Sequence, residues 1–96
     1  MNQLQFVALI TERDVIRYTP AGMPIVNAVL QHSSQQMEAG IARLIEFEIS
    51  ALAAGDISGP FSQAPLGGMY QFGGFLAKKS RNSKSLVFHI IDFSAV

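Results

Sequence analysis

Hydrophobic and polar residues alternate with the two-residue period of a β-strand in the middle of this chain. The segment 44–50 shows the pattern most clearly, because its apolar positions would face a core while Glu46 and Glu48 between them face solvent. Those apolar positions are Ile45, Phe47 and Ile49. Four other segments are rich in β-forming residues and also predict strands, namely 4–11, 25–32, 68–77 and 86–93. The pattern therefore predicts an all-β chain of five strands with no long helix.

The first predicted strand is apolar on both of its faces. Leu4, Phe6 and Ile10 lie on one side, and Val7 and Leu9 lie on the other. One face can fill the core, which leaves the second face for another subunit. The composition agrees, because hydrophobic residues make up 49% of the chain and charged residues only 15%. We expect a homodimer.

The segments between the predicted strands carry turn and loop signals. Residues 18–22 contain a proline and a glycine in the order that favours a tight turn. We expect residues 33–42 to form a polar connection that is broken at Gly40. Residues 51–67 hold several glycines and prolines, so we expect mostly loop there, with at most a short helical turn at 51–54.

Two adjacent glycines, Gly73 and Gly74, interrupt the fourth predicted strand. Paired glycines in a strand favour a bulge or a sharp bend of the kind that lets a sheet coil into a barrel. Together with the strand count, this feature favours a five-stranded OB-fold barrel formed by a single domain, residues 1–96. An SH3-like barrel also has five strands, so the count alone leaves both folds open.

Positive charge is concentrated between the last two predicted strands. Residues 78–84 contain four of the seven cations and no acid. These cations are Lys78, Lys79, Arg81 and Lys84. The formal net charge of zero therefore combines +4 in this segment, which we call the basic hairpin loop, with −4 in the rest of the chain. A solvated hairpin is the alternative interpretation, but such runs usually mix both signs, so the loop favours a site for a polyanion.

Several other classes of protein are disfavoured by the residues present. The chain has no cysteine, and His32 and His89 have no acidic residue at a metal-ligand spacing. It also lacks the turn of a nucleophilic serine and the lysine of a phosphate-binding loop. We therefore predict no enzyme activity, no metal and no cofactor. The longest apolar run is too short for a membrane span and the start has no basic region, so we expect a cytoplasmic protein without membrane contact.

Three stretches resemble one family of bacterial proteins. Residues 17–27 read Arg-Tyr-Thr-Pro-Ala-Gly-Met-Pro-Ile-Val-Asn. This run is similar to the one that joins the first two strands of bacterial single-stranded-DNA-binding proteins and of their shorter relative, the primosomal replication protein N (PriB) family. Residues 30–40, Leu-Gln-His-Ser-Ser-Gln-Gln-Met-Glu-Ala-Gly, and residues 74–81, Gly-Phe-Leu-Ala-Lys-Lys-Ser-Arg, resemble further PriB segments in the same order. The resemblance covers nearly the whole chain and is weakest at 51–67.

The end of the chain separates the two relatives. General single-stranded-DNA-binding proteins continue into a glycine-rich linker and an acidic tail, whereas this sequence ends at Val96. The resemblance to the PriB family implies an OB fold, a homodimer and a role in the replication-restart primosome. That family binds single-stranded DNA and docks or stimulates the restart helicase PriA at stalled forks. In some bacteria it also engages the loader protein DnaT.

The resemblance also implies which residues contact DNA. The four cations of the basic hairpin loop match the family's basic loop and are the expected phosphate contacts. Arg17 falls where the family has a basic residue that contacts DNA, and Arg13 is close enough in sequence to help. Because Glu12 and Asp14 flank Arg13, an ion pair at the surface is an equal alternative for it. Tyr18 can either stack on a base or pack over the turn.

Two positions depart from the family's pattern. The best-studied members place a tryptophan on the DNA-facing surface of the third strand, at or beside Glu46 of this chain, and Phe47 next to it is expected in the core. Ser33 stands where a basic residue often follows the histidine. Both changes should weaken DNA binding and increase the dependence on the basic hairpin loop. Arg43 belongs to no motif and is a minor candidate for DNA contact.

Two functions from other classes remain open. A small barrel with a basic loop can bind RNA, as cold-shock domains do, although those domains display clustered surface aromatics. The protein can also be mainly an adaptor that holds a helicase and its loader together, with weak DNA contact. In that case Glu46 and Glu48 would belong to the partner-binding surface.

Overall fold

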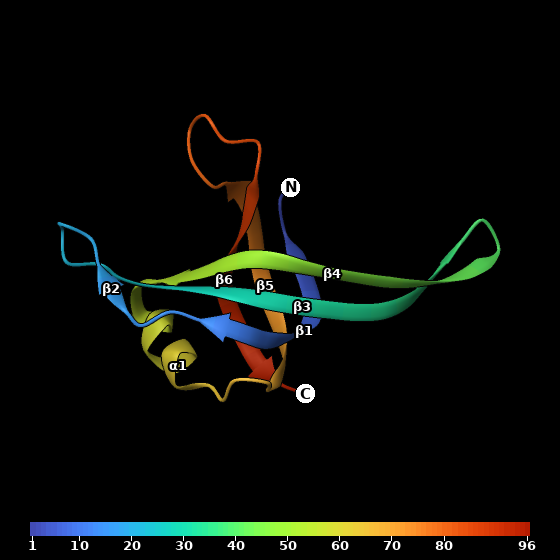
Figure 1. Cartoon of the computed structure of the whole chain (residues 1–96), viewed down its shortest axis with the longest axis horizontal. Helices are drawn as coiled ribbons and strands as arrows, with labels where there is room; N and C mark the ends of the chain where they lie inside the picture. Colours follow the sequence, from blue (N-terminus) through green and yellow to red (C-terminus); the bar gives the residue numbers. More distant parts are fainter.

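A β-sheet that closes on itself makes up most of the structure, a computed structural model that describes residues 1–96 (Figure 1). The strands are β1 (Leu4–Arg13), β2 (Arg17–Tyr18), β3 (Pro24–Glu38), β4 (Ile41–Ala54), β5 (Met69–Lys78) and β6 (Leu86–Ala95). A 3-10 turn, η1 (Gly55–Ile57), and a short helix, α1 (Ser58–Gln63), connect β4 to β5. The strand order is β1-β5-β6-β4-β3-β2, and an additional pairing of β1 with β3 closes the barrel. Five long strands form this barrel, as predicted, and the two-residue β2 is an addition.

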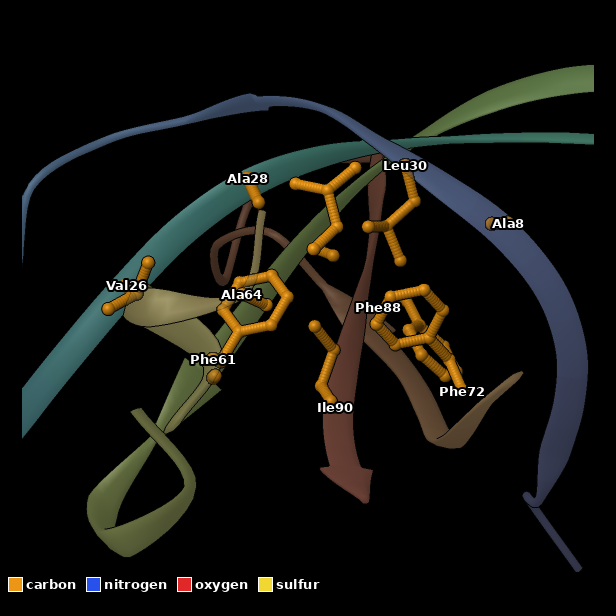
Figure 2. Packing of buried hydrophobic residues seen from close by; sticks show 12 residues of the cluster. Ala8, Val26, Ala28, Leu30, Phe61, Ala64, Phe72, Phe88 and Ile90 are labelled. Atoms are coloured by element: carbon orange, nitrogen blue, oxygen red, sulfur yellow. The ribbon is translucent and has the colours of Figure 1, made fainter. Parts of the chain in front are cut away.

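The core fills the barrel with side chains from alternate positions of its strands. Phe72 and Phe88 are fully buried, and a third buried ring, Phe61, enters from α1 (Figure 2). The centroids of the Phe61 and Phe72 rings lie 6.3 Å apart in an edge arrangement. Because α1 has only six residues and includes a glycine and a proline, its own helix propensity is weak. Burial of Phe61 therefore holds α1 against the end of the barrel.

The two adjacent glycines of β5 lie where the pairing between β5 and β6 is irregular. The pairing shifts between them, because Gly73 pairs with Asp92 and Gly74 with Ile90, which confirms the predicted bulge. A Cβ atom at Gly74 would lie 1.9 Å from the backbone oxygen of His89, so β6 occupies the space of a side chain. A Cβ atom at Gly73 would meet only the carboxylate of Asp92, with its nearest oxygen at 2.6 Å.

The prediction of a polar connection at 33–42 was wrong. β3 continues to Glu38 and β4 begins at Ile41, so only Ala39 and Gly40 turn the chain. Both have positive φ, 52° and 76°, as the mirror-image turns of tight hairpins require. In Figure 1 the end of this hairpin extends to one side, beyond the barrel. Polar residues can continue the strand there because both faces of the hairpin meet water.

The prediction that residues 51–67 are mostly loop was also wrong. Ala51 and Ala53 belong to β4 and are buried, so the short helical turn expected at 51–54 is a strand. The helical residues come later, from Gly55 in η1 to Gln63 in α1. Small alanines gave no strand signal in the sequence. They fit here because β4 passes against the core at this point.

The inner positions of β4 meet the core only where the strand crosses the barrel. Ile45, Phe47 and Ile49 share one side of β4, but only Ile49 packs against the buried cluster. Phe47 remains 40% exposed and contacts neighbouring rings instead, with centroids 5.8 Å from Phe6 and 4.8 Å from His32. The prediction of Phe47 as a core residue is therefore corrected to a partly exposed position at the rim. No helix in the structure is both long enough and apolar enough to cross a bilayer.

The contact at Gly74 predicts a large difference between two neighbouring substitutions. Gly74→Ala should lower the melting temperature by about 10–20 °C, because the new methyl group collides with the β6 backbone. Gly73→Ala is the matched control and should cost much less, because the Asp92 side chain can rotate away. Thermal unfolding followed by circular dichroism measures both. Equal losses for the two variants would contradict this account of the bulge.

Candidate nucleic-acid interface

The basic hairpin loop projects from the barrel between β5 and β6 (Figure 1). Its shape is set by its own backbone: the N–H of Lys79 donates to the oxygen of Ser85 at 2.9 Å, and the N–H of Ser83 donates to the oxygen of Ser80 at 3.1 Å. All four of its cations are exposed. The ion pair between Arg43 and Glu38 lies on the β3–β4 hairpin, and none of the four loop cations has a carboxylate within 4.0 Å. The loop therefore presents four unpaired positive charges to solvent.

Arg17 and Tyr18 form β2 and pair with Ile25 and Pro24 at the start of β3. The turn after them is closed by two backbone hydrogen bonds, from Thr19 to Met23 at 3.0 Å and from Gly22 to Thr19 at 2.8 Å. Gly22 has a φ of 89°, which explains the glycine in the predicted turn. Arg17 is exposed, and Tyr18 is 67% exposed rather than packed over the turn. Both side chains are therefore available to a ligand.

An open groove of about 430 Å³ lies between β2 and the basic hairpin loop. Arg17 lines it on one side and Lys79 on the other. Its floor consists of side chains that point outward from β3 and β4, namely Asn27, Val29, Ser50 and Leu52. In an OB fold, the outer face of the second and third barrel strands, with the loops between strands one and two and between strands four and five, forms the usual binding surface for oligonucleotides. The groove occupies this place, because β3 and β4 are the second and third barrel strands.

The charge in the groove is mixed. Arg13, Arg17 and Lys79 line it together with Glu12 and Asp14. No ion pair forms among these five side chains. The remaining cations of the basic hairpin loop lie outside the groove, further along the loop. Positive potential should therefore be strongest at the loop and weakest beside the two acids.

Arg13 lines the groove and also makes contacts that stabilise the fold. Its Nη1 group donates hydrogen bonds to the backbone oxygens of Phe61, at 3.0 Å, and of Ala64. The Phe61 oxygen lies in the last turn of α1 and also accepts from the Ala64 N–H at 3.3 Å, whereas the Ala64 oxygen belongs to the residue after the helix. The expected alternative, an ion pair with Glu12 or Asp14, does not form. Contact of Arg13 with DNA remains a prediction. To bind a phosphate, the guanidinium would have to give up its hydrogen bonds to Phe61 and Ala64, or bind the phosphate in addition to them.

The outer face of β4 continues from the groove into an acidic stretch. Ser50 pairs with Val29 in the groove, Glu48 with Gln31 next to it, and Glu46 with Ser33 beyond. Both glutamates are exposed, as predicted. Phosphate should therefore be repelled from this end of the face, which limits favourable contacts to the groove and the loop.

Sequence reasoning missed the floor of the groove. Asn27, Ser50 and Leu52 carry no motif of their own, and their positions follow from the register of β3 and β4. The alternation of buried and exposed positions was the available signal, because the neighbours Ala28 and Ala51 are buried. The structure contains no group of three or more His, Cys, Asp or Glu side chains arranged for a metal ion.

Comparisons with known proteins define first the class of this fold. The sequence matches the profile described as "Another single-strand binding protein family" over residues 2–92. The wild-type single-stranded DNA binding protein from Thermus aquaticus superposes with a TM-score of 0.77 at 17% identity, covering 100% of this chain and 50% of that one. At this identity the likeness establishes the fold alone. The chain belongs to this family and has the OB fold, as predicted, and the family is one of binding proteins rather than enzymes.

Closer relatives carry a more specific name. The "Replication restart protein PriB" of Nitrosomonas europaea is 42% identical over 91 residues, which cover 95% of this chain and 84% of the relative. The PriB of Bordetella pertussis is 39% identical over 90 residues, or 94% and 84% of the two chains. The solved structure of the protein PriB from Ralstonia solanacearum has a TM-score of 0.90 and 46% identity, and covers 100% and 99%. The chain belongs to the replication restart protein PriB family, as the sequence motifs predicted.

Replacing Arg13 by methionine should mainly affect stability, whereas replacing Arg17 by methionine should mainly affect DNA binding. Arg13→Met should lower the free energy of unfolding by about 1.5–3 kcal/mol, because the carbonyl groups of Phe61 and Ala64 lose a charged donor. Its effect on the salt dependence of DNA binding should be small. Arg17→Met should leave stability nearly unchanged but reduce the log–log salt slope by about 0.7, the value of one phosphate contact. Urea unfolding and fluorescence anisotropy measure the two quantities. The reverse pattern would contradict the roles assigned here.

Proposed function

We propose that this protein, as one OB-fold domain spanning residues 1–96, binds single-stranded DNA and acts as an accessory protein of replication restart. The observation that carries the proposal is the groove on the outer face of β3 and β4, with Arg17 on one side and Lys79 on the other. Family membership supports it, because the relatives are named replication restart proteins and their class is named for single-strand binding.

Binding would be mainly electrostatic. The loop cations and Arg17 have no carboxylate partner, so no ion pair has to break before they meet phosphate. Each phosphate contact releases counterions, which makes the affinity fall with salt concentration. The exposed ring of Tyr18, next to Arg17, can stack on a base at one end of the groove. Glu46 and Glu48 would direct the strand away from the far part of β4.

The partners in this proposal come from the family resemblance. The protein would dock or stimulate the helicase PriA at stalled forks, and DnaT would join where the organism has it. Replication restart takes place on the bacterial chromosome, so the proposal includes a cytoplasmic location. DNA held on the face with the groove leaves the opposite side of the barrel free for the helicase.

A homodimer through β1 is part of the proposal. β1 pairs with β5 over Leu4–Leu9 but with β3 only from Leu9 onward, so one edge of its first half has no strand partner, although the Val7 oxygen contacts the His32 ring. Val7 lies in this half and is 36% exposed. A free edge with an apolar side chain is a common site of strand pairing between subunits.

A second candidate function, mainly as a protein adaptor, is favoured by the projecting β3–β4 hairpin. Its outer end exposes Met37, Ile41 and Leu44, each more than 60% accessible. Exposed apolar side chains of this kind suit a protein partner better than a polyanion. RNA as the main ligand has less support, because most phenylalanine rings pack in or against the core.

The dependence of DNA binding on the basic hairpin loop tests the proposed function directly. Binding of oligothymidylate is measured by anisotropy across a salt series, for the wild type and for a variant with the four loop cations changed to alanine. If these cations and Arg17 each meet a phosphate, the wild-type log–log slope is about −3.5 and that of the variant about −0.7. Arg43→Ala is the control, because Arg43 is already paired with Glu38. If both proteins bound DNA weakly and without salt dependence, the main function would instead be that of a protein adaptor.

The dimer proposal predicts the mass of the protein in solution. Sedimentation velocity should give twice the chain mass of 10.4 kDa. Val7→Lys should reduce this to a single chain, because a lysine at a strand edge opposes pairing. Val15→Lys, in the exposed segment after β1, is the control and should remain dimeric. A wild-type protein of single-chain mass would exclude the dimer.

A further inference from the structure

A row of outward side chains crosses the sheet from the groove toward β5. Asn27 on β3 pairs with Leu52 on β4, and Leu52 pairs with His89 on β6. His89 in turn pairs with Phe75 on β5. Asn27 and Leu52 line the groove described above. The row therefore connects the groove with an aromatic pair, Phe75 and His89, to which the proposed function assigns no role.

The two rings at the end of this row are stacked on each other. The centroids of Phe75 and His89 lie 4.7 Å apart, and the ring planes differ by 10°. Both side chains are half-buried, and neither belongs to the core cluster. Their neighbours along the strands face inward instead, since Leu76 packs against the core and Phe88 and Ile90 are buried. The stacked pair thus lies on the outer surface of the barrel.

There is open space beside this pair. A second groove, of about 670 Å³, runs along the start of β1 and the bulge of β5 and β6, and Phe75 lines it together with Gly73 and Asp92. Phe75 therefore lies between this second groove and the row of outward side chains that leads to the groove beside β2. Gly73 is itself buried, and the Asp92 carboxylate lies where a side chain of residue 73 would otherwise be.

We propose that the Phe75–His89 pair is a base-stacking subsite for single-stranded DNA, which extends the interface from the groove across β6 to β5. The proposal rests on the proposed function. Phe75 is two strands away from Leu52, or roughly 10 Å at the usual strand spacing of about 4.8 Å, a distance that one or two nucleotides span. Flat rings on an outer sheet face accept any base, because every base has a π-face.

The neighbouring charges suit this arrangement. β5 runs from Phe75 directly to Lys78, and Lys79 follows at the edge of the groove. A strand whose base stacks on Phe75 would therefore keep its next phosphates beside two unpaired cations. The Asp92 carboxylate on the other side of the ring disfavours phosphate there. The charges thus direct the backbone toward the basic hairpin loop and leave the ring for the base.

The test compares the affinity of Phe75→Leu with that of the wild type for oligothymidylate. Loss of the ring should weaken binding about fivefold to a hundredfold, the usual effect of removing one stacked base. The salt slope should stay unchanged, because no phosphate contact is lost. Met69→Leu is the matched control, since Met69 is an exposed apolar residue on the same strand but away from the row. Phe75→Trp retains a flat ring and should bind at least as tightly as the wild type.

An abasic oligomer separates stacking from other effects of the substitution. The wild type and Phe75→Leu should bind this sugar–phosphate chain equally, because it offers no base to stack. Thermal unfolding of each variant shows whether the fold is retained, and Phe75→Trp serves as a second variant if Phe75→Leu is unstable. If Phe75→Leu binds oligothymidylate like the wild type while the loop variant loses binding, the subsite is overturned and the proposed function stands. If the wild type binds no oligothymidylate, both are overturned.

Discussion

The close approach of β5 and β6 at Gly74 is the constraint on which the rest of the structure depends. The backbone oxygen of His89 occupies the place that a side chain would need, and the pairing shifts by one residue beside it. This bend lets five strands close around the buried rings of Phe61, Phe72 and Phe88. Because the basic hairpin loop connects the same two strands, the geometry at Gly74 also sets where that loop stands relative to the groove.

Charge is distributed so that one edge of the barrel carries the free cations. The ion pair of the molecule lies far from this edge, between Arg43 and Glu38 on the projecting hairpin. Arg13, which sequence reasoning grouped with the DNA contacts, donates to the carbonyl oxygens of Phe61 and Ala64 and so helps to hold the end of α1. Arg13 thus makes structural contacts, whereas Arg17, only four positions later in the chain, is exposed at the surface.

Local patterns made the five strands, the turn at 18–22, the glycine bulge and the basic hairpin loop predictable from the sequence. Each depends on residues that are neighbours in the chain, such as the alternation in β4 or the pair Gly73–Gly74. Other features depend on contacts between distant residues. The polar residues at 33–38 form a strand because they pair with residues 41–46 across a hairpin in solvent. Helix α1 forms because Phe61 is buried, and the groove floor exists because of the register between β3 and β4.

The central claim is that single-stranded DNA binds on one outer face, between β2 and the basic hairpin loop. Mapping of amide chemical shifts during a titration of isotopically labelled protein with oligothymidylate tests it most directly. The account predicts that the largest changes fall on Arg17, on Leu52 and on residues 78–84 of the basic hairpin loop, whereas Ala39 and Gly40 at the tip of the hairpin stay unchanged. Changes concentrated at that tip, with none at the loop, would contradict it.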